Sequence, residues 1–491
     1  MSDLSAVEAA RRLRDAATDG GVGPILFARG LHADRLLLTA LLVRPVDTPA
    51  PNLTTPEGAF SPETVELRGG FRVWRYTFSV PTLSDAHYRI EGERYAVNAA
   101  LGSDLRLAYV SCNGREYGDR DRAVTERNAL WRRLARQHAE RPFQLLLQGG
   151  DQLYADEMFD LHPALRAWSN QDWRVADGDK FSDLAEGIRN YLFARYLELY
   201  GQPATAWLMA RVPSLAMWDD HDICDGWGSM PYAQLDSPIG RGVFQIAREL
   251  FLLFQLGAAR NELPAICPDR SGSTLTWALQ LPGLRLIAPD LRSERRPNRV
   301  LGEHGWAVLR SELDAVTNEH VFLLSSVPVL GPRLSWVEAA LHLIPHMQKY
   351  EDDLRDQWQS RAHRSEWRAF LEALLAVHER GDGRVTVLSG EIHLATHGTM
   401  QTRVGPLHQL VASGVTHPAP PAAYARALGM LARFAESPLP NHPIRLHPLP
   451  GQRAIYTAQR NYLILERRAE RWRACWELEH GGTTPCLDLG G

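Results

Sequence analysis

The chain has 491 residues, which is more than one ordinary domain of roughly 100–200 residues. Hydrophobic residues make up 45% and charged residues 23%, a composition typical of a globular protein. The formal net charge of −4 argues against a nucleic-acid or lipid surface, and no apolar run reaches the ~20 residues that cross a bilayer. We therefore expect neither a nucleic-acid partner nor a membrane partner.

The N-terminus and the cysteines indicate a cellular compartment. Residues 1–20 lack the apolar core of a secretory signal peptide, and their pattern is that of an amphipathic helix or a frayed arm. The five cysteines form an odd set without a C-x-x-C pair: Cys112, Cys224, Cys267, Cys475 and Cys486. This set argues against a disulfide framework and a zinc ribbon, and it favours a reducing, cytoplasmic location.

The pattern from residue 23 to about residue 98 is that of β-strands. Residues 71–80 alternate between apolar and polar side chains, and residues 87–97 form a predicted hairpin around Glu91-Gly92. Proline and threonine fill the gaps between these segments. Residues 1–101 are therefore predicted to be an N-terminal arm followed by a small all-β domain of the sandwich type.

At about residue 102 the pattern changes to strands that alternate with helices. The strand 105–110, the helix 123–140 and the strand 143–148 form a β-α-β unit, which we expect to be parallel and right-handed. Further helices are predicted at 183–200, 203–211, 239–256, 302–318 and 366–379, and further strands at 213–218, 276–290 (paired across Pro282-Gly283), 320–326, 385–390, 407–414, 461–466 and 471–479. Residues 102–491 are predicted to be one α/β domain.

An irregular stretch at residues 331–363 is rich in histidine, tryptophan and charge. Trp336, His342, His346 and Trp358 would suit a wall that contacts the leaving group of a substrate. An ordinary solvated insertion explains the stretch equally well.

The segment 145–157, LLLQGGDQLYADE, carries the first chemical signal. Its apolar run ends at Gly149-Gly150, which predicts a buried strand followed by a tight turn, and Asp151 and Tyr154 come directly after that turn. Ligands of an open α/β sheet gather at the carboxyl ends of its strands. Asp151 is therefore a candidate site residue, although an aspartate that only caps the next helix is the alternative.

Three further strands end in candidate ligands. These are Cys112-Asn113, the run from Asp219 to Asp222 with Asp225, and Glu391-x-His393 with His397. Carboxylate, imidazole, phenolate and thiolate groups together bind metal ions, and a single aspartate can bridge two ions about 3.5–4 Å apart. Thiolate and phenolate suit iron better than magnesium.

Each of these residues alone has an ordinary explanation. Cys112 could be a buried apolar residue, Tyr154 a packing residue, and Asp222 or Asp225 a helix cap. His397 alone is more typical of a supporting or surface histidine. The joint pattern of four strand ends is what favours a metal centre.

These motifs resemble a known family. GGDQLYADE, MWDDHD, LSGEIH and the early Ser111-Cys112 are similar to the alkaline phosphatase D (PhoD-like) branch of the calcineurin-like metallophosphatases, over residues 103 to about 467. The PDLRSERR segment at 289–296 is similar to the Asp-x-Arg segment of that family. The resemblance implies an α/β fold, a four-layer αββα metallophosphatase sandwich with a small N-terminal all-β domain.

The resemblance also implies roles for single residues. Asp151 takes the place of the bridging ligand, and His221 that of the catalytic histidine beside Asp220, which replaces an asparagine. Glu391 replaces the usual aspartate of Gly-Asp-x-His and adds one methylene to that ligand arm. The implied metal ligands are Cys112, Asp151, Tyr154, Asp220, Asp225, Glu391 and His393, and the implied catalytic residues are His221 and Asp151.

The implied function is that of a metal-dependent phosphoesterase. It would hydrolyse small phosphomonoesters or phosphodiesters by attack of a metal-activated water. The implied cofactors are two or more metal ions, iron plus calcium, with zinc, manganese or magnesium as alternatives. Another metallohydrolase on the same scaffold, or a non-catalytic family member that acts as a binding or scaffold protein, are the other two hypotheses.

Overall fold

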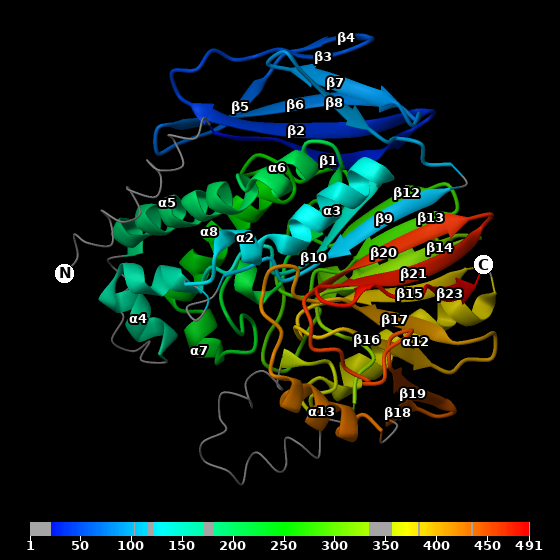
Figure 1. Ribbon diagram of the computed structural model, residues 1–491. Coiled ribbons are helices and arrows are strands. Elements are labelled where there is room, and N and C mark those ends of the chain that lie inside the picture. The colour runs from blue at the N-terminus through cyan, green and yellow to red at the C-terminus, as the bar shows by residue number, and fades with distance from the viewer. Residues whose placement is uncertain are drawn as a thin grey trace.

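Figure 1 shows a computed structural model in which two large β-sheets lie between layers of helices. It describes residues 21–102, 104–115, 119, 121–170, 181–332, 356–381, 383–433 and 436–490. The predictions for residues 1–20 and for Trp336, His342 and His346 lie outside the described residues.

The first sheet has eleven strands in the order β22-β21-β20-β9-β10-β11-β1-β2-β6-β5, with β23 on β21. At its centre are the parallel strands β9 (Leu105–Val110), β10 (Leu145–Gly149) and β11 (Ser214–Met217). Helix α3 (Ala129–Glu140) connects β9 to β10, so the predicted parallel β-α-β unit is confirmed. Every residue of the three strands is buried, because parallel strands are covered on both faces.

The second sheet has eight strands in the order β12-β13-β14-β15-β17-β16-β19-β18. The predicted hairpin across Pro282-Gly283 is confirmed, since Leu281 pairs with Leu284. The strands are β12 (Trp277–Leu281), β13 (Leu284–Ala288), β14 (His320–Ser325), β15 (Arg384–Ser389), β16 (Thr396–Met400), β17 (Leu407–Val411), β18 (Glu436–Leu439) and β19 (His442–His447).

The two sheets pack face to face through aromatic side chains. Trp472 of β21 (Arg471–Leu478) lies with its ring centroid 4.6 Å from that of Phe322 on β14. The indole nitrogen of Trp277 donates to the carbonyl of Ala216 on β11 at 2.8 Å. Successive side chains of β14 point to opposite faces of the second sheet. Phe322 packs in the core between the two sheets, and Val321 packs in the core under the outer helices.

Helices cover the outer face of each sheet. On the side of the first sheet are α3, α5 (Phe181–Tyr200), α6 (Pro203–Met209) and α8 (Pro238–Phe254), and on the side of the second are α9 (Glu303–Asp314) and α12 (Arg364–Arg380) (Figure 1). The order helix, sheet, sheet, helix is the predicted four-layer αββα architecture, which is confirmed. The short helices α2 (Val124–Arg127), α4 (Pro163–Ser169) and α7 (Tyr232–Leu235) complete these layers.

The N-terminal β-strands continue the first sheet. Strand β1 (Val22–His32) joins β11 through the parallel pair Phe27 and Ser214, and β2 (Arg35–Pro45), β6 (Phe71–Pro81) and β5 (Glu63–Arg68) follow it outward. Only β3 (Leu53–Thr55), β4 (Gly58–Phe60), β7 (Ala86–Ile90) and β8 (Glu93–Val97) form a separate four-stranded sheet. The all-β character of this part agrees with the sequence, and a domain boundary at residue 101 stays a prediction.

The argument against disulfides from the cysteine pattern is wrong for one pair. Strand β23 (Leu487–Gly490) runs antiparallel to β21 with Ala474 opposite Leu487, which brings Cys475 beside Cys486, and the two form a disulfide. Disulfides persist mainly in oxidising environments, so this bond does not support the cytoplasmic location, which stays a prediction. None of the described helices is long and apolar enough to span a bilayer.

Two other features differ from the sequence prediction. Trp358 is buried with its ring centroid 4.7 Å from that of Phe370, so it packs in the core and forms no substrate wall. Strands β16, β18 and β19 and helix α13 (Ala422–Leu431) were not predicted, and they form the lower part of the molecule in Figure 1. The remaining elements are β20 (Asn461–Arg468) and β22 (Gly482–Thr483).

Candidate metal centre

The predicted ligands lie at the carboxyl ends of neighbouring strands in the two sheets. Cys112 follows β9, Asp151 follows β10, and Asp220 follows β11 in the first sheet. Glu391 and His393 follow β15 of the second sheet. The centre therefore lies where the ends of the two sheets meet.

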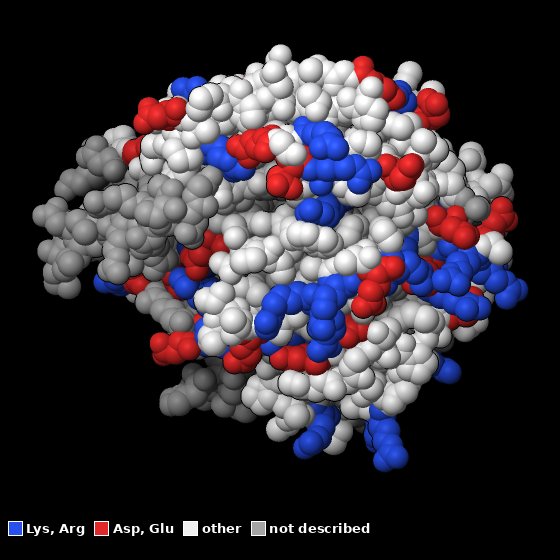
Figure 2. Space-filling view, turned by 45° about the horizontal axis from the view of Figure 1, so that its top comes forward, with Lys and Arg blue, Asp and Glu red and all other residues white. Residues whose placement is uncertain are grey.

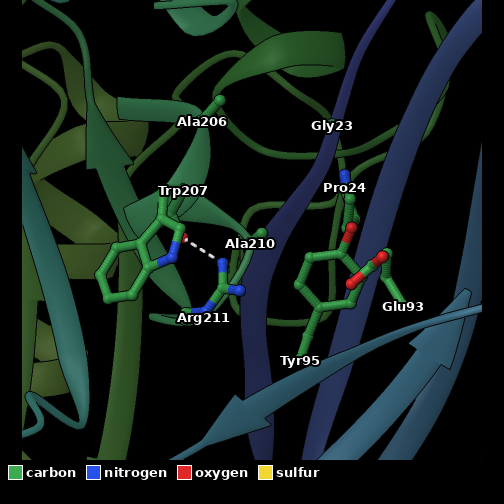
Figure 3. Close-up of a pocket in the computed structure, with 8 residues that line it drawn as sticks. All are labelled: Gly23, Pro24, Glu93, Tyr95, Ala206, Trp207, Ala210 and Arg211. Atoms are coloured by element: carbon green, nitrogen blue, oxygen red, sulfur yellow. Dashed lines mark hydrogen bonds between the residues drawn. The ribbon is translucent and has the colours of Figure 1, made fainter. Parts of the chain in front are cut away.

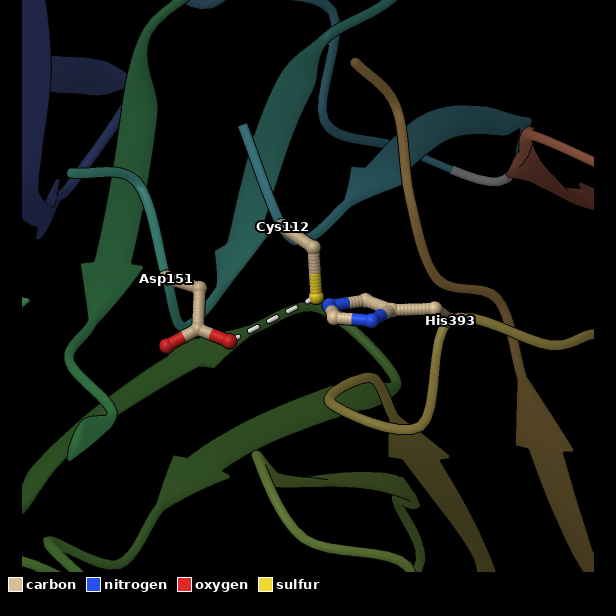
Figure 4. A group of neighbouring side chains, drawn as sticks. All are labelled: Cys112, Asp151 and His393. Atoms are coloured by element: carbon tan, nitrogen blue, oxygen red, sulfur yellow. Dashed lines mark hydrogen bonds between the residues drawn. The ribbon is translucent and has the colours of Figure 1, made fainter. Parts of the chain in front are cut away.

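One group of ligand atoms joins the two sheets. The side-chain donors of Cys112, Asp151 and His393 lie within 4.8 Å of one another. Figure 4 shows the three side chains pointing toward one another, with Cys112 Sγ 3.5 Å from Asp151 Oδ2. Ser413 supports this group, because its hydroxyl lies 3.1 Å from Cys112 Sγ and accepts the backbone N–H of His393 at 2.9 Å.

Asp151 also belongs to a second group. Its carboxylate lies within 4.8 Å of those of Asp219 and Asp220, and Asp220 in turn lies within that distance of His221 and Asp225. A carboxylate shared by two ligand groups is the arrangement that bridges two metal ions. The structure thus brings together Cys112, Asp151, His393, Asp220, His221 and Asp225 from the predicted set.

The backbone is strained at four of the predicted ligands. Cys112, Asp151, Glu391 and His393 have φ angles of 53°, 54°, 60° and 53°, in the left-handed region that non-glycine residues avoid. Nine non-glycine residues in the described part of the chain adopt positive φ, and these four are among them. Such strain costs of order 1–3 kcal/mol per residue and gathers at functional sites.

Two glycines leave room for the ligands. Gly150 has φ +99°, and a Cβ there would lie 2.8 Å from the Cβ of Asp219. Gly114 lies against Tyr154, where a Cβ would fall 1.5 Å from the phenol ring. Side chains at these positions would push Asp219 and Tyr154 out of the centre.

Two carboxylates of the centre, those of Asp151 and Asp219, are buried away from solvent. Asp151 Oδ1 and Asp219 Oδ2 are buried and have no hydrogen-bond partner among the described residues. Burial, then the neighbouring Asp219 and Asp220, raise the pKa of Asp151 well above its usual range, and burial raises the pKa of Asp219 to about 6. Buried oxygens without a partner, beside carboxylates of the same charge, fit the binding of cations.

The softer donors of the centre also fit metal ions. Burial, then Asp151, raise the pKa of the Cys112 thiol, and a cation at bonding distance would instead hold it as the thiolate. Burial, then His417, lower the pKa of His393, which favours the neutral imidazole that binds metals. Tyr154 places its hydroxyl 2.9 Å from His393 Nε2.

His221 is oriented by an acidic partner. Its Nδ1 lies 2.7 Å from Asp156 Oδ2, and its Nε2 lies 4.0 Å from Asp225 Oδ1. The ring stacks on Tyr154 with centroids 4.2 Å apart. Burial lowers the pKa of His221, but Asp156 and Asp220 outweigh burial and raise that pKa well above its usual range.

Two predicted candidates fall outside the ligand groups of the described residues. Both oxygens of Glu391 accept hydrogen bonds from the Gln357 amide, at 2.8 and 2.9 Å. His397 lies within β16, where its Nε2 is 2.9 Å from His408 Nδ1 on β17. The assignment of Glu391 as a metal ligand therefore stays a prediction. His397 lies outside the ligand groups, as the sequence prediction of a supporting or surface histidine indicated.

Arg292, from the Asp-x-Arg segment, balances part of the negative charge. Its fully buried guanidinium donates to Asp219, to Asp220 at 3.2 Å and to Asp356 at 2.7 and 2.9 Å. Burial lowers the pKa of Arg292, but these three carboxylates outweigh burial and raise it well above its usual value. Arg292 therefore remains charged.

A family comparison agrees with this geometry. A model of the PhoD-related phosphatases matches residues 94–351, more than half of the chain. The chain belongs to the PhoD-related phosphatase family.

Solved structures show the same fold. A structure of PhoD aligns over 96% of this chain and 89% of its own, with a TM-score of 0.58 and 11% sequence identity. Purple acid phosphatase PPD1 from yellow lupin (Lupinus luteus) seeds aligns over 96% of this chain and 74% of its own, with a TM-score of 0.52 and 10% identity. At these identities the likeness concerns the metallophosphatase fold.

A relative of this PhoD-related chain is found in yeast. The uncharacterized Saccharomyces cerevisiae protein YGR266W is 23% identical over 396 residues, which cover 68% of this chain and 55% of the yeast protein. The chain thus spans about half the length of the curated relative that it matches.

Two residues at the centre, His417 and Asp219, are not among the ligands predicted from the sequence. His417 lies after β17 and stacks on His393 with ring centroids 3.6 Å apart. The sequence prediction assigns no role to Asp219, whose carboxylate lies within 4.8 Å of that of Asp151. The signal for His417 was present, because residues 407–414 were a predicted strand and a polar side chain at its carboxyl end has the same placement as the other ligands.

A cavity of about 280 Å³ lies apart from this centre, beside β1, β8 and α6 (Figure 3). The guanidinium of Arg211 lies 4.4 Å from the ring centroid of Trp207 and 5.1 Å from that of Tyr95. The lining residues are Gly23, Pro24, Glu93, Tyr95, Ala206, Trp207, Ala210 and Arg211. None of them belongs to the metal-ligand groups.

The side chain of Asp222 connects the two ligand-bearing turns of the first sheet. Its carboxylate accepts the backbone N–H groups of Asp151 at 2.9 Å, Leu153 at 3.0 Å and Asp219 at 2.9 Å. It also accepts the amide of Gln255 at 2.7 Å. Asp222 therefore holds Asp151 and Asp219 at a fixed separation without being a ligand itself.

Replacement of Asp222 should destabilise the fold even without metal. Asp222→Ala leaves buried N–H donors without an acceptor, so we expect the free energy of unfolding to fall by about 3–5 kcal/mol. Denaturant unfolding in the presence of a chelator measures this change. Asp225→Ala is the matched control, because that carboxylate is 62% exposed and its removal should cost less than about 1 kcal/mol. Equal losses in the two variants would contradict the role of Asp222.

Proposed function

We propose that this protein is a metal-dependent phosphoesterase that hydrolyses small phosphomonoesters or phosphodiesters at a centre of two or more metal ions. One observation carries the proposal. Asp151 is shared between the group with Cys112 and His393 and the group with Asp219 and Asp220, and its Oδ1 has no partner among the described residues. Membership of a phosphatase family supports the proposal.

The two groups suit different ions. Cys112, His393 and Tyr154 offer thiolate, imidazole and phenolate donors, which suit iron or zinc. Asp219 and Asp220 offer carboxylate oxygens, which suit calcium, magnesium or manganese. We propose iron in the first group and calcium in the second, with Asp151 between them. Bound cations would neutralise charge on the phosphoryl oxygens and activate a water molecule.

The side chain of His221 supplies the remaining chemistry. When a water oxygen attacks phosphorus, the ester P–O bond breaks and the leaving oxygen needs a proton. Asp156 engages Nδ1 of His221 and fixes the ring, which leaves Nε2 to donate that proton. His221 has an alternative role as a metal ligand, because its ring nitrogen lies within 4.8 Å of carboxylate oxygens of Asp220 and Asp225.

A purely non-catalytic scaffold is less consistent with this geometry. The buried carboxylates around Asp151 and the strained backbone at Cys112, Asp151 and His393 lower stability. A binding protein that acts through its surface has no use for this loss of stability. A metal-dependent hydrolase needs the buried carboxylates and the strained ligand turns to hold its metal ions.

Removal of the thiol should change the metal content selectively. Cys112→Ser should lose iron and the visible absorption that thiolate and phenolate give to iron(III), and it should retain the metal held by the carboxylates. Elemental analysis of protein made without added metal, together with absorption spectra, measures this. Cys267→Ser is the control, because Cys267 is equally buried but lies outside the ligand groups. Unchanged iron in Cys112→Ser would reject the iron assignment, and wild-type protein without metal would reject the proposed function.

Replacement of His221 separates its two possible roles. If His221 protonates the leaving oxygen, His221→Asn should keep both metals and lose about 10²–10⁴ in kcat on an alkyl phosphate ester. The loss should be smaller on a nitrophenyl ester, whose leaving group needs little protonation. Steady-state kinetics on both esters, with metal analysis, tests this. Loss of a metal, or the same loss of kcat on both esters, would reject the general-acid role, and loss of a metal would assign His221 as a ligand.

A further inference from the structure

Helix α13 exposes large apolar side chains to solvent. Tyr424 is 46% exposed, Met430 61% and Leu431 39%, and within the helix only Ala425 is fully buried. Single exposed apolar residues are ordinary, but these three share one helix of ten residues. The preceding loop at 418–421 is Pro-Ala-Pro-Pro and is exposed or half-buried throughout. Exposed apolar side chains therefore occur in both the loop 418–421 and α13.

The stretch of chain that contains α13 has almost no acidic residues. Residues 392–465 contain a single acidic residue, Glu436, although the whole chain has 58. Glu436 is buried and pairs with Arg364 at 2.8 Å, so it adds no negative charge to the surface. The same stretch contains Arg403, Arg426, Arg433, Arg445, Arg453 and Arg460. Arg426 and Arg433 are exposed on α13 and just after its end.

The figures place this combination at one edge of the molecule. Helix α13 lies at the lower edge in Figure 1. The lower edge in Figure 2 is white, with two blue side chains projecting from it. Within the described residues of the stretch 392–465, exposed apolar side chains thus occur beside exposed arginines and without an exposed acidic side chain.

The α13 surface is joined to the metal centre. Ala425 and Ala432 share a small core with Leu394, and Ile392, which lies between Glu391 and His393, packs against that core. The chain also reaches α13 directly from His417, whose ring stacks on that of His393. The helix therefore sits beside the site and is supported by the same loop.

We propose that α13 and the loop 418–421 dock onto an anionic membrane surface. Tyr424, Met430 and Leu431 would enter the interface, while Arg426 and Arg433 would lie against lipid phosphates. An amphipathic helix with an apolar face and basic residues is the form that lies in the plane of a lipid interface. A second copy of the chain fits less well, because a two-fold interface would bring the arginines of both copies together.

Docking on a membrane differs from the expectation of no membrane partner. That expectation used the net charge of −4, which averages over 491 residues and hides the almost acid-free stretch 392–465. Docking would bring the metal centre close to lipid headgroups, and a lipid phosphate ester as substrate is a consequence that rests on the proposed function. Docking itself requires no turnover.

Vesicle flotation with the full-length chain tests the docking. Vesicles of phosphatidylcholine alone are compared with vesicles that also contain phosphatidylserine, at low and high salt. We expect binding to the anionic vesicles that weakens with salt. Met430→Glu with Leu431→Glu should reduce binding by about tenfold or more, and Arg426→Ala with Arg433→Ala should reduce the salt-sensitive part.

The matched control introduces the same charges elsewhere. Leu67→Glu with Leu83→Glu replaces exposed leucines in the N-terminal β-strands and the loop after them, far from α13, and should leave binding unchanged. Absence of binding to anionic vesicles overturns the proposal, and so does equal binding by the wild type and the α13 variant. An oligomer that dissociates in the α13 variant, without vesicle binding, also overturns it and assigns the face to a second copy. Flotation measures binding to vesicles and not hydrolysis, so its result is independent of the proposed enzymatic function.

Discussion

Carboxylates buried around Asp151 impose the constraint on which the rest of the structure depends. Burying a charge is costly unless an opposite charge or hydrogen bonds compensate it. Arg292 offsets part of this cost for Asp219, Asp220 and Asp356, and backbone N–H groups offset part of it for Asp222. Asp151 receives no such partner at Oδ1. The proposed metal ions would supply the positive charge that Asp151 lacks, and this connects the fold to the proposed chemistry.

The two-sheet architecture meets this constraint by bringing distant strands to one point. Cys112 and Asp151 come from the first sheet, and His393 comes from the second. The aromatic contacts between Trp472 and Phe322, and between Trp277 and the backbone of β11, fix one sheet against the other. Backbone strain at the ligands is sustained only because the sheets and the Asp222 hydrogen bonds hold the turns in place. Stability elsewhere thus offsets the cost of the site.

Much of this organisation could be predicted from local patterns. Apolar runs that end in Gly149-Gly150 or before Cys112 located β9 and β10 and their ligands, because buried parallel strands and the placement of ligands at their carboxyl ends both leave a local trace. Long-range pairing leaves none. Phe27 pairs with Ser214, and Ala474 pairs with Leu487 beside the disulfide. Neither pairing can be predicted from the sequences of the two paired segments. The bonds from Gln357 to Glu391 depend on the same kind of distant placement.

The central claim is that Asp151 bridges two metal ions. Anomalous diffraction at the iron absorption edge and away from it, on crystals of the protein as purified, tests this most directly. The account predicts two peaks about 3.5–4 Å apart, one beside Cys112 and His393 and one beside Asp219 and Asp220, each in contact with Asp151. A single peak, or two peaks of which one does not touch Asp151, would contradict it.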